Sequence, residues 1–205
     1  WRTSGDAKQP IVLYEYQPDR KAERPKDFLK GFQGYLHADG YSGYHRLPDN
    51  IKVVGCWAHA RRKFDEALKG LPEKARAGSL SLRAKQYCDK LFELEREFSN
   101  LSPEDRYLER QKQSKPLMEE LFHWLRAQNV STKSAFGNAA NYVLEQKKYL
   151  VGYLLDGRLE ISNNRAERSI KPFVIGRKNF LFANTARGAN ASAVLYSIVE
   201  TAKEN

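Results

Sequence analysis

Apolar residues recur at three- and four-residue spacing through the middle of this chain of 205 residues, from about residue 58 to residue 157. Such spacing predicts helices, because it places the apolar side chains on one stripe of each helix. Three helices are expected, over residues 80–98, from Ser102 onward with a kink at Pro116, and over residues 136–157. A loop without structure is rarely this long, so residues 58–157 are expected to form an all-helical insertion.

The segments before this insertion have the composition of strands. Residues 11–16 and 51–57 are rich in β-branched and aromatic side chains, and residues 34–38 are a short apolar run. Between residues 11–16 and residues 34–38, residues 25–32 fit a short helix with proline at its first position. The order strand, helix, strand, strand is typical of a mixed sheet with helices on its faces, so we expect an α/β or α+β core.

Three further elements are expected after the insertion. They are a helix that carries Glu167 and ends at Pro172, an edge strand over residues 180–183, and a last helix over residues 188–203 whose apolar face is Ala191, Val194, Leu195, Ile198 and Val199. The core is therefore expected in two parts, residues 1–57 and residues 158–205, with the helical insertion of residues 58–157 between them.

The chain carries a formal net charge of +10, from 35 basic and 25 acidic residues. This balance favours a polyanionic partner, and nucleic acid is the leading candidate because its phosphates bind many Lys and Arg side chains on one surface. The alternative is a solvated surface that is basic without binding anything, and only clustering of the charges separates the two interpretations.

Cysteine usage and hydropathy indicate the compartment. The two cysteines, Cys56 and Cys88, are too few for a disulfide framework and fit a reducing environment. The sequence has no apolar stretch of membrane-spanning length and no secretion signal, so we expect a cytoplasmic protein without membrane partners. Because the chain starts at Trp1 rather than at Met, we interpret it as a fragment of a longer protein.

Asp39 and Glu167 are the candidate catalytic and metal-binding residues, because acids placed where an apolar run meets turn-forming residues can hold a metal ion. Asp39 follows a short strand and precedes Gly40, which lets the backbone turn sharply. Glu167 lies in the first turn or two of a helix that Ser162 or Asn163 can cap, where the macrodipole favours an anion. The structural alternatives are that Asp39 only forms a turn and that Glu167 only stabilises the helix N-terminus.

Basic residues are dense around Glu167. Residues 162–183 contain only this acid but five basic residues, namely Arg165, Arg168, Lys171, Arg177 and Lys178. The first three recur at three-residue spacing, so they can line a strip of the helix that binds a DNA backbone. Of Asn163 and Asn164, one is expected to cap the helix and the other to hold the glutamate or a phosphate, and Asn164 is the candidate DNA-binding residue.

A second basic group lies at the start of the insertion. His59, Arg61 and Arg62 are expected on a helix beside the active edge of the sheet, where they can bind a DNA phosphate. One alternative is that Arg61, Arg62 and Lys63 form a solvated face. The other is a zinc site with Cys56 and His59, but zinc normally takes four ligands and the sequence offers few more.

Four blocks of sequence, in this order, resemble the catalytic domain of the insertion-sequence-66 (IS66) transposase family. They are ADGYSGYHRL (38–47), GCWAHARRKFDEAL (55–68), SNNRAERSIKP (162–172) and IGRKNFLFA (175–183). The resemblance spans nearly the whole chain and implies a DDE transposase, with an RNase H-like mixed sheet and a site of two aspartates and a glutamate. Asp39 matches the second aspartate and Glu167 the glutamate, whereas the first aspartate of the family lies upstream of the segment that Trp1 resembles.

The resemblance implies an enzyme that cuts and joins DNA at the ends of a bacterial insertion sequence. In-line attack on a phosphodiester uses two metal ions, and hard oxygen ligands select magnesium or manganese. Two carboxylates hold one ion loosely and two ions need a third, so the fragment alone is expected to be inactive. The expected partners are DNA and further copies of the protein in a homo-oligomeric active complex.

Two alternatives to a transposase remain open. One is an RNase H-like nuclease that only hydrolyses, and the other is a non-catalytic DNA-binding or assembly module in which Asp39 and Glu167 are structural. The helical insertion can position DNA, form a dimer interface or cover the site, and its apolar stripes do not choose among these roles.

Overall fold

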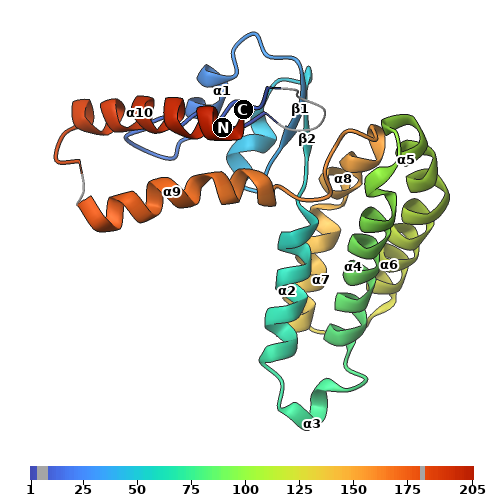
Figure 1. The fold of residues 1–205 in the computed structure, drawn as a ribbon. Coiled ribbons are helices and arrows are strands. Elements are labelled where there is room, and N and C mark those ends of the chain that lie inside the picture. Colours follow the sequence, from blue (N-terminus) through green and yellow to red (C-terminus); the bar gives the residue numbers. More distant parts are fainter. Residues whose placement is uncertain (4–8, 181–182) are drawn as a thin grey trace. The chain divides into compact units, whose positions relative to one another are not determined.

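The structure is a computed structural model that describes residues 1–3, 9–180 and 183–205. The chain forms two compact units, which we call the central unit (Phe32–Ser162) and the terminal unit (Trp1–Gly31 together with Asn163–Asn205). Helices dominate both units (Figure 1). The central unit joins the predicted strands after residue 32 to the predicted helical insertion. The division of one sheet core into residues 1–57 and 158–205 stays a prediction.

A parallel pair of strands lies in the central unit, β1 (Gly34–His37) and β2 (Ile51–Val54). The strands pair along their whole length, so their carboxyl ends meet at one edge. Parallel strands need a crossover connection, and a 3-10 helix over Ser42–Arg46 lies within it. The mixed α/β class and these two strands are confirmed, whereas a larger RNase H-like sheet stays a prediction.

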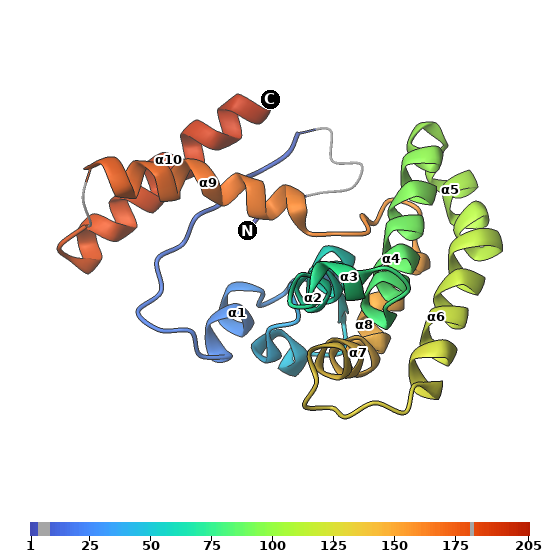
Figure 2. The same cartoon turned by 90° about the horizontal axis from the view of Figure 1, so that it is seen from below.

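Four helices of the central unit pack in a ring, in which α2 and α6 each contact both α4 and α7 (Figures 1 and 2). Their bounds are Trp57–Lys69 for α2, Leu80–Glu97 for α4, Lys115–Ala127 for α6 and Ala135–Glu145 for α7. The shorter elements between and after them are α3 (Glu73–Arg76), a 3-10 helix (Phe98–Asn100), α5 (Pro103–Glu109), α8 (Lys147–Leu150) and a 3-10 helix (Val151–Leu155). The apolar stripe of each of these four helices faces the interior of the ring, as its spacing predicts.

The interruption expected at Pro116 takes the form of a π-helical turn. Ser102 caps α5 by accepting the N–H of Asp105 at 3.1 Å, as the sequence predicts. The chain then forms one π-helical turn over Arg110–Ser114 before α6 begins. Proline removes a backbone hydrogen bond and crowds the preceding turn, and a wider turn placed directly before Pro116 accommodates both effects.

The last predicted helix of the insertion is broken into α7, α8 and a 3-10 helix that ends at Leu155. The chain then reaches Gly157, as expected from the sequence. A Cβ at this position would lie 1.8 Å from the carbonyl oxygen of Pro103. Only glycine allows the backbone to pass so close to the start of α5.

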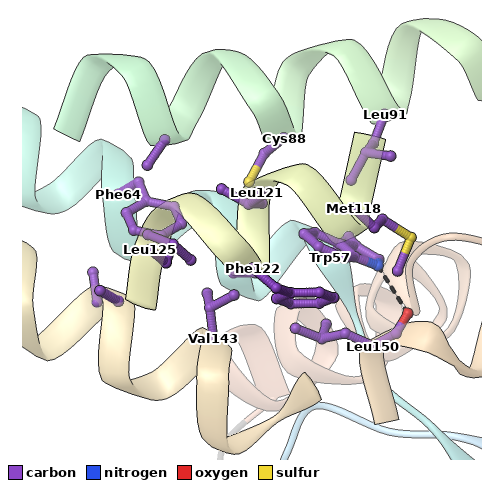
Figure 3. Packing of buried hydrophobic residues seen from close by; sticks show 14 of the residues in the cluster. Trp57, Phe64, Cys88, Leu91, Met118, Leu121, Phe122, Leu125, Val143 and Leu150 are labelled. Atoms are coloured by element: carbon purple, nitrogen blue, oxygen red, sulfur yellow. Dashed lines mark hydrogen bonds between the residues drawn. The ribbon is translucent and has the colours of Figure 1, made fainter. Parts of the chain in front are cut away.

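The core of the central unit surrounds Trp57 (Figure 3). This side chain is fully buried, and its indole N–H donates to the carbonyl of Leu150 at 2.9 Å. Buried side chains from each helix of the ring pack in the same cluster, among them Phe64, Leu91, Phe122 and Val143. A buried tryptophan needs such a partner for its N–H, and here the bond joins the first residue of α2 to the last residue of α8.

The described residues of the terminal unit form the helices α1 (Glu23–Phe28), α9 (Asn164–Phe180) and α10 (Ala186–Glu204). The short helix expected over residues 25–32 is therefore present but begins earlier and ends earlier. None of the helices described in this structure has the length and apolar composition needed to cross a membrane.

The strand predicted over residues 11–16 is wrong. Val12 forms only an isolated bridge with Arg2. The backbone N–H groups of Val12 and Tyr14 instead donate to hydroxyls of α10, those of Thr201 at 3.0 Å and Ser197 at 2.8 Å. Backbone groups need hydrogen-bond partners. On one side the segment pairs with residues 1–3, where the N–H of Leu13 donates to the carbonyl of Trp1 at 2.8 Å, and on the other side the hydroxyls of α10 take the place of a strand.

The end predicted for the Glu167 helix is also wrong. Pro172 lies inside α9, which continues to Phe180. A proline removes one backbone hydrogen bond, and α9 continues despite this loss. The edge strand expected over residues 180–183 begins at a residue that belongs to α9, and its middle, residues 181–182, lies outside the described residues.

The helix predicted over residues 188–203 is confirmed as α10, but its apolar face is exposed. The five residues expected on that face, Ala191, Val194, Leu195, Ile198 and Val199, are all classed as exposed. The side of α10 that packs in the terminal unit carries Ala193, Ser197 and Thr201 at four-residue spacing. Because this small and hydroxylated stripe contacts the segment around Val12, the larger apolar residues point away from it.

Candidate functional site

Asp39 lies two residues beyond β1, at the edge where the carboxyl ends of the two strands meet. The N–H of Ala38 donates to the carbonyl of Val54 at 2.9 Å, so the pairing continues up to the residue before Asp39. Gly40 then adopts φ +86°, a left-handed conformation that turns the chain. The side chain of Asp39 is exposed. A carboxylate at this edge is accessible to a ligand, as in other sheets with parallel strands.

A local hydrogen bond orients the carboxylate of Asp39. Its Oδ1 accepts the N–H of Tyr41 at 3.1 Å. This is the bond expected of a turn-forming aspartate, so the structural interpretation of Asp39 has direct support. A carboxylate has two oxygens and several lone pairs, so the bond also leaves it able to bind a cation.

His37, the last residue of β1, joins the ends of the two strands. Its Nε2 lies 2.8 Å from the carbonyl oxygen of Gly55. A carbonyl only accepts, so this ring nitrogen carries the proton. Burial lowers the pKa of His37, which keeps the ring neutral at pH 7.

Tyr142 of α7 lies against the Asp39 turn, and the sequence analysis does not single it out. Its hydroxyl oxygen is 3.5 Å from the backbone carbonyl oxygen of Asp39, and a Cβ at Gly40 would lie 3.0 Å from it. Burial raises the pKa of Tyr142, Cys56 and Asp39 add to the rise, and Arg62 opposes it. A tyrosine on an amphipathic helix gives no local signal that distinguishes this position from an ordinary core residue.

The candidate DNA-binding residues of α2 have different surroundings. Arg61 forms an ion pair with Asp89 of α4, which Lys85 also contacts at 2.8 Å. Arg62 is exposed, and it is close enough to Tyr142 for its charge to affect the pKa of that hydroxyl. His59 is partly buried in the first turn of α2. Arg61 therefore contributes to the packing of the helix ring, while Arg62 lies on the Asp39 side.

Cys56, the N-cap residue of α2, is buried, and so is Cys88 of α4. Burial raises the pKa of Cys88 to about 12. Over the described ranges 1–3, 9–180 and 183–205, no three His, Cys, Asp or Glu side chains form a group that can hold a metal ion.

Glu167 lies in the first turn of α9, in the terminal unit. The helix begins at Asn164, and the N–H of Glu167 donates to the carbonyl of Asn163 at 3.0 Å. The predicted position of Glu167 is therefore confirmed. The first turn of a helix favours an anion, because its free N–H groups and the macrodipole are positive there. The side chain of Glu167 is half-buried.

The basic strip predicted beside Glu167 is present on the surface of α9. Arg165, Arg168 and Lys171 are exposed, and Lys178 is exposed further along the helix. Asn164 is half-buried at the start of the helix. The backbone of Arg177 belongs to α9, and its side chain lies outside the described part of the structure.

A depression of about 450 Å³ in the terminal unit adjoins this strip. Its lining consists of Arg2, Val12, Arg165, Arg168, Ser169, Pro172, Glu200 and Glu204. The guanidinium of Arg2 donates to both carboxylate oxygens of Glu204, at 2.7 and 2.6 Å, and to the hydroxyl of Ser169 at 2.7 Å. Arg2 is thus a structural member of this surface, and no sequence motif marks it.

The two acids of the predicted site belong to different units. Asp39 lies in the central unit and Glu167 in the terminal unit. Each one has the local position that the sequence predicts, at the end of a strand and in the first turn of a helix. Their use of a common metal ion stays a prediction.

Comparison with known proteins shows the family of the chain. The family model described as "Transposase IS66 family" matches residues 1–191. The uncharacterized protein y4hP of Sinorhizobium fredii (strain NBRC 101917 / NGR234) is 33% identical over 219 residues, which cover 100% of this chain and 40% of y4hP. The uncharacterized protein y4jD of the same organism is 34% identical over 206 residues, which cover 95% of this chain and 39% of y4jD.

The chain therefore spans about two fifths of the length of these relatives. No solved structure matches it.

Proposed function

The chain belongs to the IS66 transposase family, and on this premise we propose that it is part of an enzyme that cuts and joins DNA at the ends of an insertion sequence. The observation that carries the proposal is the position of Asp39, an exposed carboxylate at the carboxyl edge of a parallel strand pair. Glu167, in the first turn of α9, supplies the second acid.

The donor atoms of these two residues suit magnesium or manganese. Both offer hard carboxylate oxygens, which these ions prefer over nitrogen and sulfur ligands. Two carboxylates hold one ion loosely and two ions need a third, so in this proposal another part of the full-length protein supplies a further acidic ligand. Two bound ions would activate the attacking oxygen and stabilise the leaving oxygen.

The residues of this chain orient the acids and the DNA. The N–H of Tyr41 orients the carboxylate of Asp39, and the first turn of α9 holds Glu167. The candidate DNA-binding residues bind phosphates and so orient the DNA without reading its bases. They are His59, Arg61, Arg62, Asn164, Arg165, Arg168, Lys171, Arg177 and Lys178. Arg61 already pairs with Asp89, which reduces the charge that it offers to a phosphate.

The fragment of 205 residues is inactive by itself in this proposal, because it supplies two of the three acids. A supercoiled-plasmid nicking assay with magnesium tests this directly. We expect no nicking by the fragment. Robust nicking that is lost in Asp39→Asn would mean that the third acid is dispensable.

The main experiment uses the full-length protein, as a homo-oligomer if it forms one, with labelled insertion-sequence ends. Asp39→Asn and Glu167→Gln are expected to lose both cleaved and joined products while gel-shift assays detect unchanged DNA binding. Asp49→Asn and Glu104→Gln, at exposed acids, serve as matched controls.

The same experiment separates the alternatives. Cleavage without joined product in the wild-type protein would indicate an RNase H-like nuclease. Full activity in Glu167→Gln would indicate that the acids are structural and that the chain is a DNA-binding or assembly module.

A further inference from the structure

The turn that carries Asp39 is held by a distant part of the same unit. The hydroxyl of Tyr142, on α7, lies 3.5 Å from the backbone carbonyl oxygen of Asp39 and is oriented to donate to it. The two residues are 103 positions apart in the sequence. At this length the hydrogen bond alone is weak, so the packing around it must be considered as well.

Gly40 indicates how closely the turn approaches α7. A Cβ at this position would lie 3.0 Å from the hydroxyl oxygen of Tyr142 and 3.4 Å from Oε1 of Gln146. Gly40 also has φ +86°, which residues with a side chain rarely adopt. The positive φ favours glycine here, and a Cβ would press on the side chains of Tyr142 and Gln146, so the turn lies close against α7 and the residue after it.

The chain beyond β2 is hydrogen-bonded to α8, which directly follows α7. The N–H of Gly55 donates to the carbonyl of Tyr149 at 2.8 Å, and the indole of Trp57 donates to the carbonyl of Leu150 at 2.9 Å. Val143 of α7 is fully buried in the core. The segment formed by α7 and α8 is therefore fixed in a close-packed interior, and it contacts the chain at the carboxyl ends of both strands.

The carboxylate of Asp39 follows the movements of its turn, because its Oδ1 accepts the N–H of Tyr41. The phenol hydroxyl of Tyr142 can donate to the carbonyl oxygen of Asp39, as a tyrosine hydroxyl ordinarily does. A contact from α7 to the backbone of the turn therefore bears on the place of the carboxylate that the turn carries.

We propose that Tyr142 is a positioning residue for Asp39, and that the helical insertion sets the place of this carboxylate in the active site. The inference rests on the proposed function of Asp39. It gives the insertion a role that its apolar stripes alone do not indicate. A displacement of about 1 Å in a reacting group can cost about a hundredfold in rate, so the loss of one hydroxyl should be measurable.

The test compares Tyr142→Phe with Tyr107→Phe in the full-length protein. Tyr107 lies on α5 and is 40% exposed, so its replacement is a matched control for the loss of a tyrosine hydroxyl. The rate of DNA strand cleavage is measured over a series of magnesium concentrations. Manganese binding is measured separately by electron paramagnetic resonance, together with the melting temperature and DNA binding in a gel-shift assay.

Tyr142→Phe is expected to slow cleavage between about tenfold and a hundredfold at low magnesium. It should also raise the magnesium concentration for half-maximal rate and weaken manganese binding, while melting temperature and DNA binding stay at the values of Tyr107→Phe. The inference is overturned if metal dependence and manganese binding remain those of the wild type. It is equally overturned if activity falls only in step with a lower melting temperature.

Asp39→Asn in the same assay separates this inference from the proposed function. If Asp39→Asn is inactive while Tyr142→Phe behaves as the wild type, only the positioning role is wrong. If Asp39→Asn cleaves DNA at the wild-type rate, the proposed function fails and the positioning role fails with it.

Discussion

The guanidinium of Arg110 binds both carboxylate oxygens of Glu95 inside the central unit, at 2.8 and 2.6 Å. Arg110 is 1% exposed and opens the π-helical turn before α6. It also donates to three backbone carbonyls near the end of the helical segment, those of Tyr153, Asp156 and Leu159. One buried side chain therefore joins α4, the π-helical turn and the segment that leads to the terminal unit.

Replacement of this arginine should destabilise the central unit strongly. Arg110→Met leaves the carboxylate of Glu95, only 12% exposed, without its buried counter-charge. We expect a loss of about 3–5 kcal/mol in the free energy of unfolding, measured by urea denaturation. Lys112→Met is the control, because Lys112 is 75% exposed and its pair with Glu109 should contribute at most about 1 kcal/mol. Equal losses in the two variants would contradict this account.

The ion pair between Arg2 and Glu204 predicts an acid-sensitive terminal unit. The hydrogen-bonded guanidinium of Arg2 lowers the pKa of Glu204 below its ordinary value of 4.5. A carboxyl whose pKa is lowered by folding contributes stability above 4.5, and this contribution is lost as the pH falls through the lowered pKa. Melting temperatures between pH 6 and pH 3 should therefore fall less in Glu204→Gln than in the wild type. If the melting temperatures of the two proteins fall in parallel with pH, the ion pair between Arg2 and Glu204 adds nothing to the stability of the terminal unit.

Both cysteines should be unreactive in the folded protein. Cys88 is fully buried with a pKa of about 12, and Cys56 is 2% exposed. The thiolate is the reactive form, so a thiol-specific reagent at pH 8 should label neither residue until the chain is unfolded with urea. Rapid labelling of one equivalent in native buffer would show that one of these residues is accessible, contrary to the structure.

The exposed strip on α9 predicts a defined salt dependence of DNA binding. In the full-length protein, Arg165→Gln and Arg168→Gln should each reduce the slope of log affinity against log salt concentration by about 0.9, because each removes one phosphate contact. Lys90→Gln, at an exposed position of α4 that pairs with Glu93, should leave the slope unchanged. If all three variants keep the wild-type slope, α9 does not contact the DNA backbone.

Local signals in the sequence were sufficient to predict most of the described helices and the strands β1 and β2. The apolar spacing of residues 80–98 and the cap at Ser102 depend only on neighbours in the sequence, and both are confirmed. Residues 11–16 have equally good strand composition, but hydroxyls of α10 accept the N–H groups of Val12 and Tyr14. Pro172 has the signal of a helix end and lies inside α9. Contacts with distant residues decide such cases, and sequence spacing does not contain them.

The same limit applies to the candidate site. The positions of Asp39 at a strand end and of Glu167 in a first helical turn follow from the residues beside them, and the structure has both. Tyr142 and Arg2 contact residues more than a hundred positions away, and neither belongs to a recognisable motif. Arg61 looks like its neighbour Arg62 in sequence, but only the structure reveals its pairing with Asp89.

The central claim is that Asp39 and Glu167 bind a common metal ion in the full-length protein. The most direct measurement is a crystal structure of that protein with manganese, in which anomalous scattering locates the ions. We predict a manganese peak bound by carboxylate oxygens of both residues. Well-ordered oxygens of Asp39 and Glu167 more than about 10 Å apart, beyond the reach of two bridged ions, would contradict the account.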